Sequence, residues 1–127
     1  MKPFSLYIVG VLFAVLSSAA IAGGIPFEKK TFDELRTAGR PVVVHVYAKW
    51  CETCQKQATI TPSLLAAPEF KELTLMEADF DKEKALLKEL HVPYQSTFVA
   101  FKGTAEVGRS TGETNKERIA ALFRKAL

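Results

Sequence analysis

Residues 41–54 read Pro41-Val-Val-Val-His45-Val-Tyr-Ala-Lys-Trp50-Cys51-Glu-Thr-Cys54. In the β-branched run, the residues that would point to either face of a strand are apolar, except for His45. This pattern predicts a central strand that is buried on both faces. If Cys51 stands in the first turn of a helix, Cys54 lies three residues on, on the same face and within disulfide reach. The positive end of that helix would favour a thiolate at Cys51, and the thiolate is the species that attacks disulfides. The stretch therefore predicts a redox-active dithiol at the start of a helix that directly follows a strand.

The first 22 residues have the three parts of a secretory signal. Lys2 supplies a positive charge, residues 6–16 are apolar or glycine, and Ala20-Ile-Ala22 ends a stretch of small residues. We expect cleavage after Ala22, with an uncleaved membrane anchor as the alternative. The remaining residues, 23–127, are predicted to form one domain. Export would place this domain in the periplasm or an equivalent extracytoplasmic space.

Charge and cysteine usage exclude two classes of protein. The formal net charge is +3, and removal of Lys2 leaves 16 basic and 14 acidic side chains that alternate in sign along the chain. Because no basic stripe forms, we expect no nucleic-acid partner. The two cysteines lie in one short motif, whereas a disulfide-stapled scaffold needs several dispersed pairs. So small a loop contributes little stability, and the pair is therefore predicted to be used in chemistry.

Hydrophobic periodicity predicts alternating helices and strands along the rest of the chain. Besides the strand at 42–47, the predicted strands are 73–79, 97–101 and 106–110, the last two joined as a hairpin by a turn at 102–104. The predicted helices are 31–39, 51–66, 82–90 and a C-terminal helix that begins at 114–117. This order requires a mixed four-stranded sheet with helices on both faces, an α/β fold.

Local signals set the expected helix boundaries. Capping boxes at Thr31–Glu34 and Thr114–Glu117 predict two helix starts. Asp81 is a candidate N-cap for the helix at 82–90. Pro62 is expected to break or kink the helix that follows the cysteines, and Pro68 to stop it.

In this order of elements, Trp50-Cys51-Glu52-Thr53-Cys54 resembles the motif of the thioredoxin superfamily, and the resemblance extends over essentially all of residues 23–127. It implies a thioredoxin-like fold and a thiol–disulfide oxidoreductase whose redox group is the Cys51–Cys54 disulfide, with no other cofactor and no metal. Cys51 would be the exposed attacking thiol and Cys54 the buried resolving thiol. Residues 68–70 and 77–79 look more like exported reductases, similar to the periplasmic C-terminal domain of the membrane-embedded thiol transporter.

Three positions depart from the pattern of the superfamily. His45 stands where thioredoxins carry a buried carboxylate, and Glu77 stands where a lysine often faces it, so that acid and base would have changed places. Ser96 stands at the position of the cis-proline. We expect the Gln95–Ser96 bond to be trans, since a cis bond before a non-proline residue costs roughly 2.5–4 kcal/mol. The loop is expected to lie against the cysteines but to be held less tightly.

The resemblance also implies a shell around the dithiol that shapes the substrate groove. Its expected members are Trp50, Glu52, Thr53, Glu77, Gln95, Ser96 and Thr97. Trp50 is expected to pack against the motif and limit solvent access. Glu52 opposes thiolate formation at Cys51 and so predicts a more reducing couple.

His45 and Glu77 have two interpretations each. A neutral imidazole at His45 would take the proton from Cys54, or His45 would be a hydrogen-bonded core residue without a chemical role. Glu77 is expected to be a half-exposed strand residue, with a role in proton transfer as the alternative.

We therefore expect a monomeric, extracytoplasmic thiol–disulfide oxidoreductase that reduces protein disulfides. Its partners would be exported cysteine-containing proteins as acceptors and a membrane thiol or electron carrier as donor. A metal or iron–sulfur binding module is one alternative, with His45 and His91 as the further candidate ligands. The other alternative is a non-catalytic docking subunit that keeps the fold.

Overall fold

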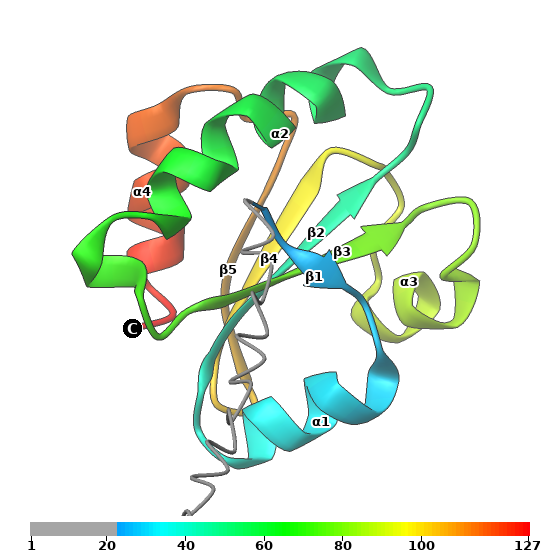
Figure 1. Ribbon diagram of the computed structural model, residues 1–127. Helices are drawn as coiled ribbons and strands as arrows, with labels where there is room; N and C mark the ends of the chain where they lie inside the picture. Colours follow the sequence, from blue (N-terminus) through cyan, green and yellow to red (C-terminus); the bar gives the residue numbers. More distant parts are fainter. Residues whose placement is uncertain (1–22) are drawn as a thin grey trace, which may run out of the picture.

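The structure, a computed structural model, describes residues 23–127. The predicted signal segment, residues 1–22, lies outside the described residues. Within the described part, a five-stranded mixed sheet carries helices on both faces (Figure 1). Its elements are β1 (Ile25–Pro26), α1 (Lys29–Thr37), β2 (Pro41–Tyr47), α2 (Glu52–Leu65), a 3₁₀ turn (Pro68–Phe70), β3 (Thr74–Asp79), α3 (Lys84–Leu90), β4 (Thr97–Lys102), β5 (Ala105–Thr111) and α4 (Lys116–Arg124).

Strand β2 is the centre of the sheet, as its sequence predicts. The strand order is β1-β3-β2-β4-β5, and β2 runs parallel to β3 and antiparallel to β4. This register places His45 beside Glu77 on one neighbour and beside Phe98 on the other. The predicted hairpin of β4 and β5 is confirmed, and Gly103 turns it with φ +58°. The sheet thus brings His45, in the middle of the buried strand β2, beside Glu77 of the neighbouring strand β3.

The prediction of four strands is wrong by one. Strand β1 consists of Ile25 and Pro26 alone, and it pairs parallel with Met76 and Glu77 of β3. Two residues are too few for a periodic pattern, and proline is rare inside a strand. The pairing partner alone defines this strand.

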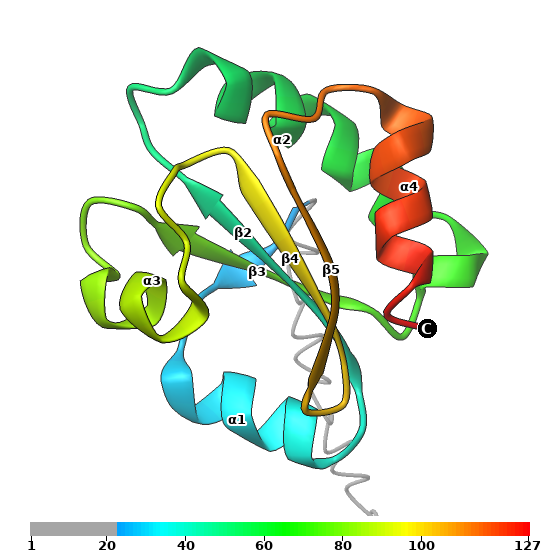
Figure 2. The same cartoon turned by 180° about the vertical axis from the view of Figure 1, so that it is seen from behind.

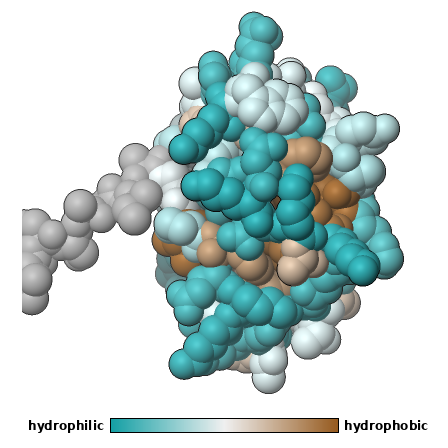
Figure 3. All heavy atoms as spheres, turned by 90° about the vertical axis from the view of Figure 1, so that its right-hand side faces the viewer, coloured by the Kyte–Doolittle hydropathy of each residue, from teal (hydrophilic) through white to brown (hydrophobic). Residues whose placement is uncertain are grey.

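Two apolar cores lie on opposite faces of the sheet, because β2 and β4 send alternate buried side chains to each face. One core joins the sheet to α1 and α3 through residues such as Phe32 and Leu86. The other joins it to α2 and α4 through residues such as Leu64 and Ile119. Figures 1 and 2 show these two pairs of helices on the two sides of the sheet. The face in Figure 3 is largely hydrophilic, with a hydrophobic strip between polar regions.

The predicted N-cap positions are displaced by one to three residues. Helix α1 begins at Lys29 with Glu28 as N-cap, and α3 follows Glu83 instead of Asp81. The amide of Asp81 is held in a turn by Asp79, whose carboxylate accepts its N–H at 2.8 Å. At α4, Asn115 takes the cap position and accepts the amide N–H of Arg118 at 3.0 Å. Several short polar side chains in such stretches can take the N-cap position. The residue type alone therefore does not determine which of them begins the helix.

Helix α2 continues through Pro62, so of the predicted break or kink the break is wrong. It runs unbroken from Glu52 to Leu65, and the amide of Ala66 still donates to the Pro62 carbonyl at 3.1 Å. A proline removes one backbone donor, and the buried positions Thr61 and Leu64 keep the helix against the sheet. No helix in residues 23–127 combines the length and the apolar character that crossing a membrane requires.

Candidate active site

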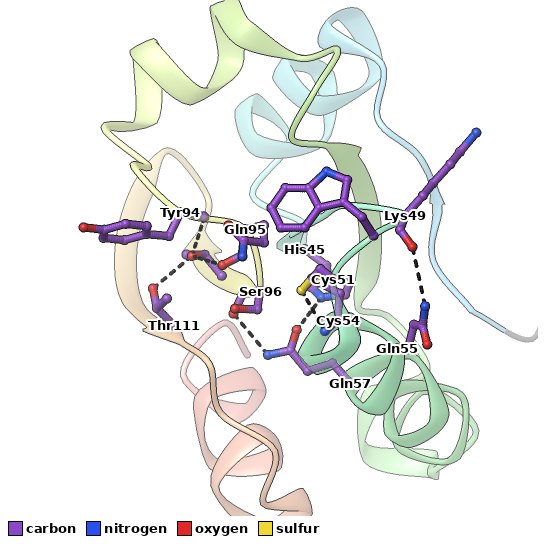
Figure 4. Close-up of a disulfide and its surroundings, with 12 residues drawn as sticks. His45, Lys49, Cys51, Cys54, Gln55, Gln57, Tyr94, Gln95, Ser96 and Thr111 are labelled. Carbon is purple, nitrogen blue, oxygen red and sulfur yellow. Dashed lines mark hydrogen bonds between the residues drawn. A yellow bond between two sulfur atoms is a disulfide. The ribbon is translucent and has the colours of Figure 1, made fainter.

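The two cysteines form a disulfide at the N-terminus of α2. Their Cα atoms are 5.3 Å apart, within the range that a disulfide spans. Cys51 is the N-cap residue, with extended backbone, and its Sγ accepts the amide N–H of Cys54 at 3.1 Å (Figure 4). A backbone donor and the positive end of a helix therefore point at the sulfur of Cys51. This arrangement stabilises a thiolate there after the disulfide is reduced.

Both cysteines are 3% exposed, so the expectation that Cys51 alone is exposed is wrong for the disulfide form. The N-cap position turns the Cys51 side chain back over the helix start, next to Cys54. Trp50, by contrast, is 62% exposed. Its indole Nε1–H donates to the Asp81 carboxylate at 2.9 Å, which anchors the ring to the segment after β3. Solvent reaches the indole more than it reaches either sulfur.

His45, Glu77 and a third residue, Gln57, form a hydrogen-bonded chain behind the disulfide. The Nδ1 atom of His45 lies 2.7 Å from Oε2 of Glu77, and its Nε2 lies 2.8 Å from Oε1 of Gln57. The imidazole is 1% exposed and stacks on Phe98, with the ring centroids 4.4 Å apart. The predicted exchange of acid and base thus yields a direct contact between His45 and Glu77. The chemical roles assigned to these two residues stay predictions.

Gln57 is not among the predicted site residues, although its spacing on the helix is a signal for an inward position. Cys54, Gln57, Thr61 and Leu64 share the buried face of α2, and Gln57 is completely buried. A glutamine on the inward face of a helix must find hydrogen-bond partners inside the protein. Its amide Nε2–H₂ group donates to the carbonyls of Ser96 at 3.1 Å and Glu113 at 3.0 Å.

A pocket of about 310 Å³ connects the resolving cysteine with the His45–Glu77 pair. Its lining residues are His45, Tyr47, Ala48, Lys49, Cys54, Gln55, Ala58 and Glu77. Burial raises the pKa of Tyr47, and the carboxylates of Asp79 and Glu77 raise it further. A protonated phenol therefore lines the pocket at neutral pH, next to Glu77, which is partly exposed.

The loop before β4 lies against the disulfide, as expected, and hydrogen bonds hold it (Figure 4). The Gln95–Ser96 bond is trans, and Ser96 adopts a left-handed conformation with φ +56°. Its carbonyl accepts the amide N–H of Gly112 at 2.9 Å in addition to the Gln57 amide. The Thr97 hydroxyl donates to the Tyr94 carbonyl at 2.8 Å and lies 2.9 Å from the hydroxyl of Thr111. These contacts fasten the loop on both sides of Ser96.

The remaining predicted residues lie at the edge of the site. Glu52 is exposed in the first turn of α2, and Thr53 and Gln95 are half-buried. His91 is exposed at the C-terminus of α3, away from the strand that carries His45. Among residues 23–127, no three His, Cys, Asp or Glu side chains come together in a way that would hold a metal ion.

Comparison with known proteins agrees with this geometry. The thioredoxin family model matches residues 24–125. A thioredoxin of Chlamydia trachomatis is 31% identical over 85 residues, which are 66% of this chain and 80% of that protein. The protein disulfide-isomerase erp38 of Neurospora crassa is 30% identical over 105 residues, which are 80% of this chain and 28% of that protein. The chain spans less than a third of the length of such larger relatives.

A solved structure matches along nearly all of its length. The crystal structure of Trxlp from Edwardsiella tarda superimposes with a TM-score of 0.77 at 33% identity, covering 80% of this chain and 98% of that one. The fold, the helix-capping disulfide and the family match therefore lead to one conclusion: this chain belongs to the thioredoxin family and is a thiol–disulfide oxidoreductase.

Proposed function

We propose that this oxidoreductase works outside the cytoplasm and reduces the disulfides of exported proteins. The observation that carries the proposal is the contact between the Cys54 amide N–H and the Sγ of Cys51 at the start of α2. It marks Cys51 as the sulfur that is stabilised as a thiolate and attacks. The signal-like pattern of residues 1–22 supports export.

The reaction has two exchange steps. In the reduced protein, the Cys51 thiolate attacks one sulfur of a substrate disulfide, and the other substrate sulfur leaves as a thiolate. Cys54 then loses its proton and attacks the Sγ of Cys51, which re-forms the Cys51–Cys54 disulfide. The second substrate sulfur leaves as a thiolate, and the substrate has gained two electrons.

Glu52 supports the direction of electron flow. Its exposed carboxylate lies in the first turn of α2, directly after Cys51, where a negative charge repels the thiolate. A less stable thiolate makes the dithiol a stronger reductant. The reduction potential, measured by equilibration with glutathione buffers, is expected to lie below about −200 mV. A value near that of the strong periplasmic oxidants, about −120 mV, would refute the reductase role.

The partners follow from the compartment. A dithiol outside the cytosol has no soluble nicotinamide-linked reductase, so a membrane thiol or electron carrier is the proposed donor. A Cys54→Ser variant cannot resolve the mixed disulfide and should trap both partners when it is produced in the native compartment. Capture of a membrane carrier and an exported cysteine-containing protein is expected. Capture of cytosolic proteins alone would contradict the proposed location.

Export itself is tested directly on the wild-type protein. Cell fractionation followed by N-terminal sequencing should find the protein outside the cytoplasm, beginning at Gly23. A protein recovered from the cytoplasm with an intact N-terminus would refute the export step while leaving the exchange chemistry in place.

A further inference from the structure

The orientation of the buried Gln57 amide is fixed by its surroundings. Its nitrogen lies 3.1 Å from the carbonyl oxygen of Ser96 and 3.0 Å from that of Glu113, and both carbonyls can only accept. A flipped amide would place its oxygen against these two oxygens. The two carbonyls therefore use both N–H groups of the amide, and Oε1 of Gln57 must face His45.

This orientation determines the protonation of the nearer imidazole nitrogen. The Nε2 atom of His45 lies 2.8 Å from Oε1 of Gln57, which has no proton to give. Nε2 must therefore carry a proton and donate it. The imidazole is 1% exposed, and Oε1 of Gln57 is the hydrogen-bond partner of its Nε2.

The second imidazole nitrogen faces a carboxylate. The Nδ1 atom of His45 and Oε2 of Glu77 are 2.7 Å apart, and two lone pairs would repel each other at that distance. One proton must lie between them, whether it is bound to the ring or to the carboxyl group. His45 and Glu77 thus form a neutral pair, and the ring has no free lone pair.

We infer that Gln57 is a positioning residue that makes Glu77, and not His45, the acceptor of the Cys54 proton. The inference rests on the proposed exchange chemistry at Cys51 and Cys54. When Cys54 attacks the Sγ of Cys51, its proton passes to an oxygen of Glu77, and the proton shared between Glu77 and His45 settles on Nδ1 of the ring. The His45–Glu77 pair then holds one extra proton and a charge of +1, and it releases that proton to solvent after the disulfide has formed.

The pocket supplies the route for this proton. Cys54 and Glu77 both line it, and its volume of about 310 Å³ is roughly ten times the ~30 Å³ that one water molecule occupies in the liquid. Bridging water can therefore carry the proton between the two side chains. The other titratable groups facing the pair are Tyr47 on β2 and Lys49 after it, whereas β4 contributes only the apolar ring of Phe98.

Nitrogen NMR of ¹⁵N-histidine-labelled protein tests the role of Gln57. In the wild type at neutral pH, the Nε2 of His45 should give a protonated signal. In Gln57→Met the acceptor is lost, and this signal should move toward that of an unprotonated nitrogen, because Nε2 gives up its proton and the ring keeps only the proton shared between Nδ1 and Glu77. Gln55→Met, the same change at an exposed site of α2, should leave both His45 signals in place. An unprotonated Nε2 in the wild type would overturn the assignment.

The proton acceptor is tested by kinetics with an aromatic disulfide, 5,5′-dithiobis(2-nitrobenzoate). Attack by Cys51 on this reagent releases a first coloured thiolate, and attack by Cys54 releases a second. In Glu77→Gln, which keeps an acceptor for the imidazole N–H, the second phase should slow by about tenfold or more. Its rate should then rise about tenfold per pH unit, as hydroxide replaces the carboxylate.

Each outcome of the kinetic test is decisive. A second phase in Glu77→Gln within twofold of the wild type would refute Glu77 as acceptor. If the wild type itself releases neither equivalent of thiolate, the proposed exchange chemistry fails instead. The NMR result is independent of that chemistry, so the two failures can be told apart.

Discussion

Replacing Gln57 with methionine should destabilise the protein mainly through its effect on His45. Methionine has a similar length and fills the space, but it cannot accept the proton of the imidazole Nε2–H. The Ser96 carbonyl keeps a second partner in the Gly112 amide, and the Glu113 carbonyl, which also loses its Gln57 donor, belongs to a half-buried residue and can be solvated. The fully buried Nε2 atom of the imidazole is left without a hydrogen-bond partner, which costs about 1–3 kcal/mol. That is a large share of the roughly 5–15 kcal/mol by which a domain is stable.

A double-mutant cycle isolates this interaction. His45→Phe removes the imidazole and retains an aromatic ring against Phe98, and Glu77 is partly exposed and can be solvated. In the double variant no unpartnered imidazole nitrogen remains, so Gln57→Met should cost much less in the His45→Phe background. The expected coupling energy is about 1–3 kcal/mol.

Urea unfolding of the oxidised proteins supplies the four free energies. The fluorescence of Trp50, the sole tryptophan, and far-UV circular dichroism are two independent probes. Gln55→Met is the matched surface control and should stay within about 0.5 kcal/mol of the wild type. If Gln57→Met also stays within that limit, or if the coupling energy is near zero, the buried hydrogen bond between His45 and Gln57 contributes little to stability.

Three further predictions concern other parts of the molecule. Glu52→Gln should raise the reduction potential by about 6–20 mV. This shift corresponds to the about 0.3–1 kcal/mol that a charge contributes at a helix N-terminus. An unchanged or lower potential would show that the Glu52 carboxylate does not oppose the thiolate. Gly24→Ala should destabilise the fold, because a Cβ atom there would lie 2.7 Å from the carbonyl oxygen of Leu75 and 2.8 Å from Cγ of Glu77. Thermal unfolding that matches the wild type would contradict this close packing. Ile119→Ala should lower the free energy of unfolding in urea by about 2–5 kcal/mol, since the side chain is completely buried in the core beneath α4. A loss below about 1 kcal/mol would be inconsistent with that burial.

The sequence predicts the parts of the fold that periodicity controls. The central strand at 42–47 and the apolar faces of α3 and α4 are where the pattern places them, because burial repeats with the period of the element. Strand β1 is not predicted, because two residues are too few to show a periodic pattern. The helix starts shift because several neighbouring polar residues compete for each cap, and tertiary packing decides between them.

The sequence likewise predicts some features of the site and not others. The dithiol follows from the spacing of Cys51 and Cys54, and the pairing of His45 with Glu77 follows from strand register. The role of Gln57 does not, because its helical spacing from Cys54 indicates only that it faces inward, whereas its partners His45, Ser96 and Glu113 lie on other segments of the chain. The protonation of the imidazole depends on all of these contacts together, so no local pattern encodes it.

The hydrogen-bonded chain behind the disulfide also links chemistry to the completion of folding. The cysteines are three residues apart and can meet in a nascent helix. The contacts of His45 with Gln57 and Glu77 span 12 and 32 residues, and those of Gln57 with Ser96 and Glu113 span 39 and 56. Loop closure over such separations comes late in folding. In a partly folded chain, the two thiols can therefore meet before the groups that accept and release their protons are in place.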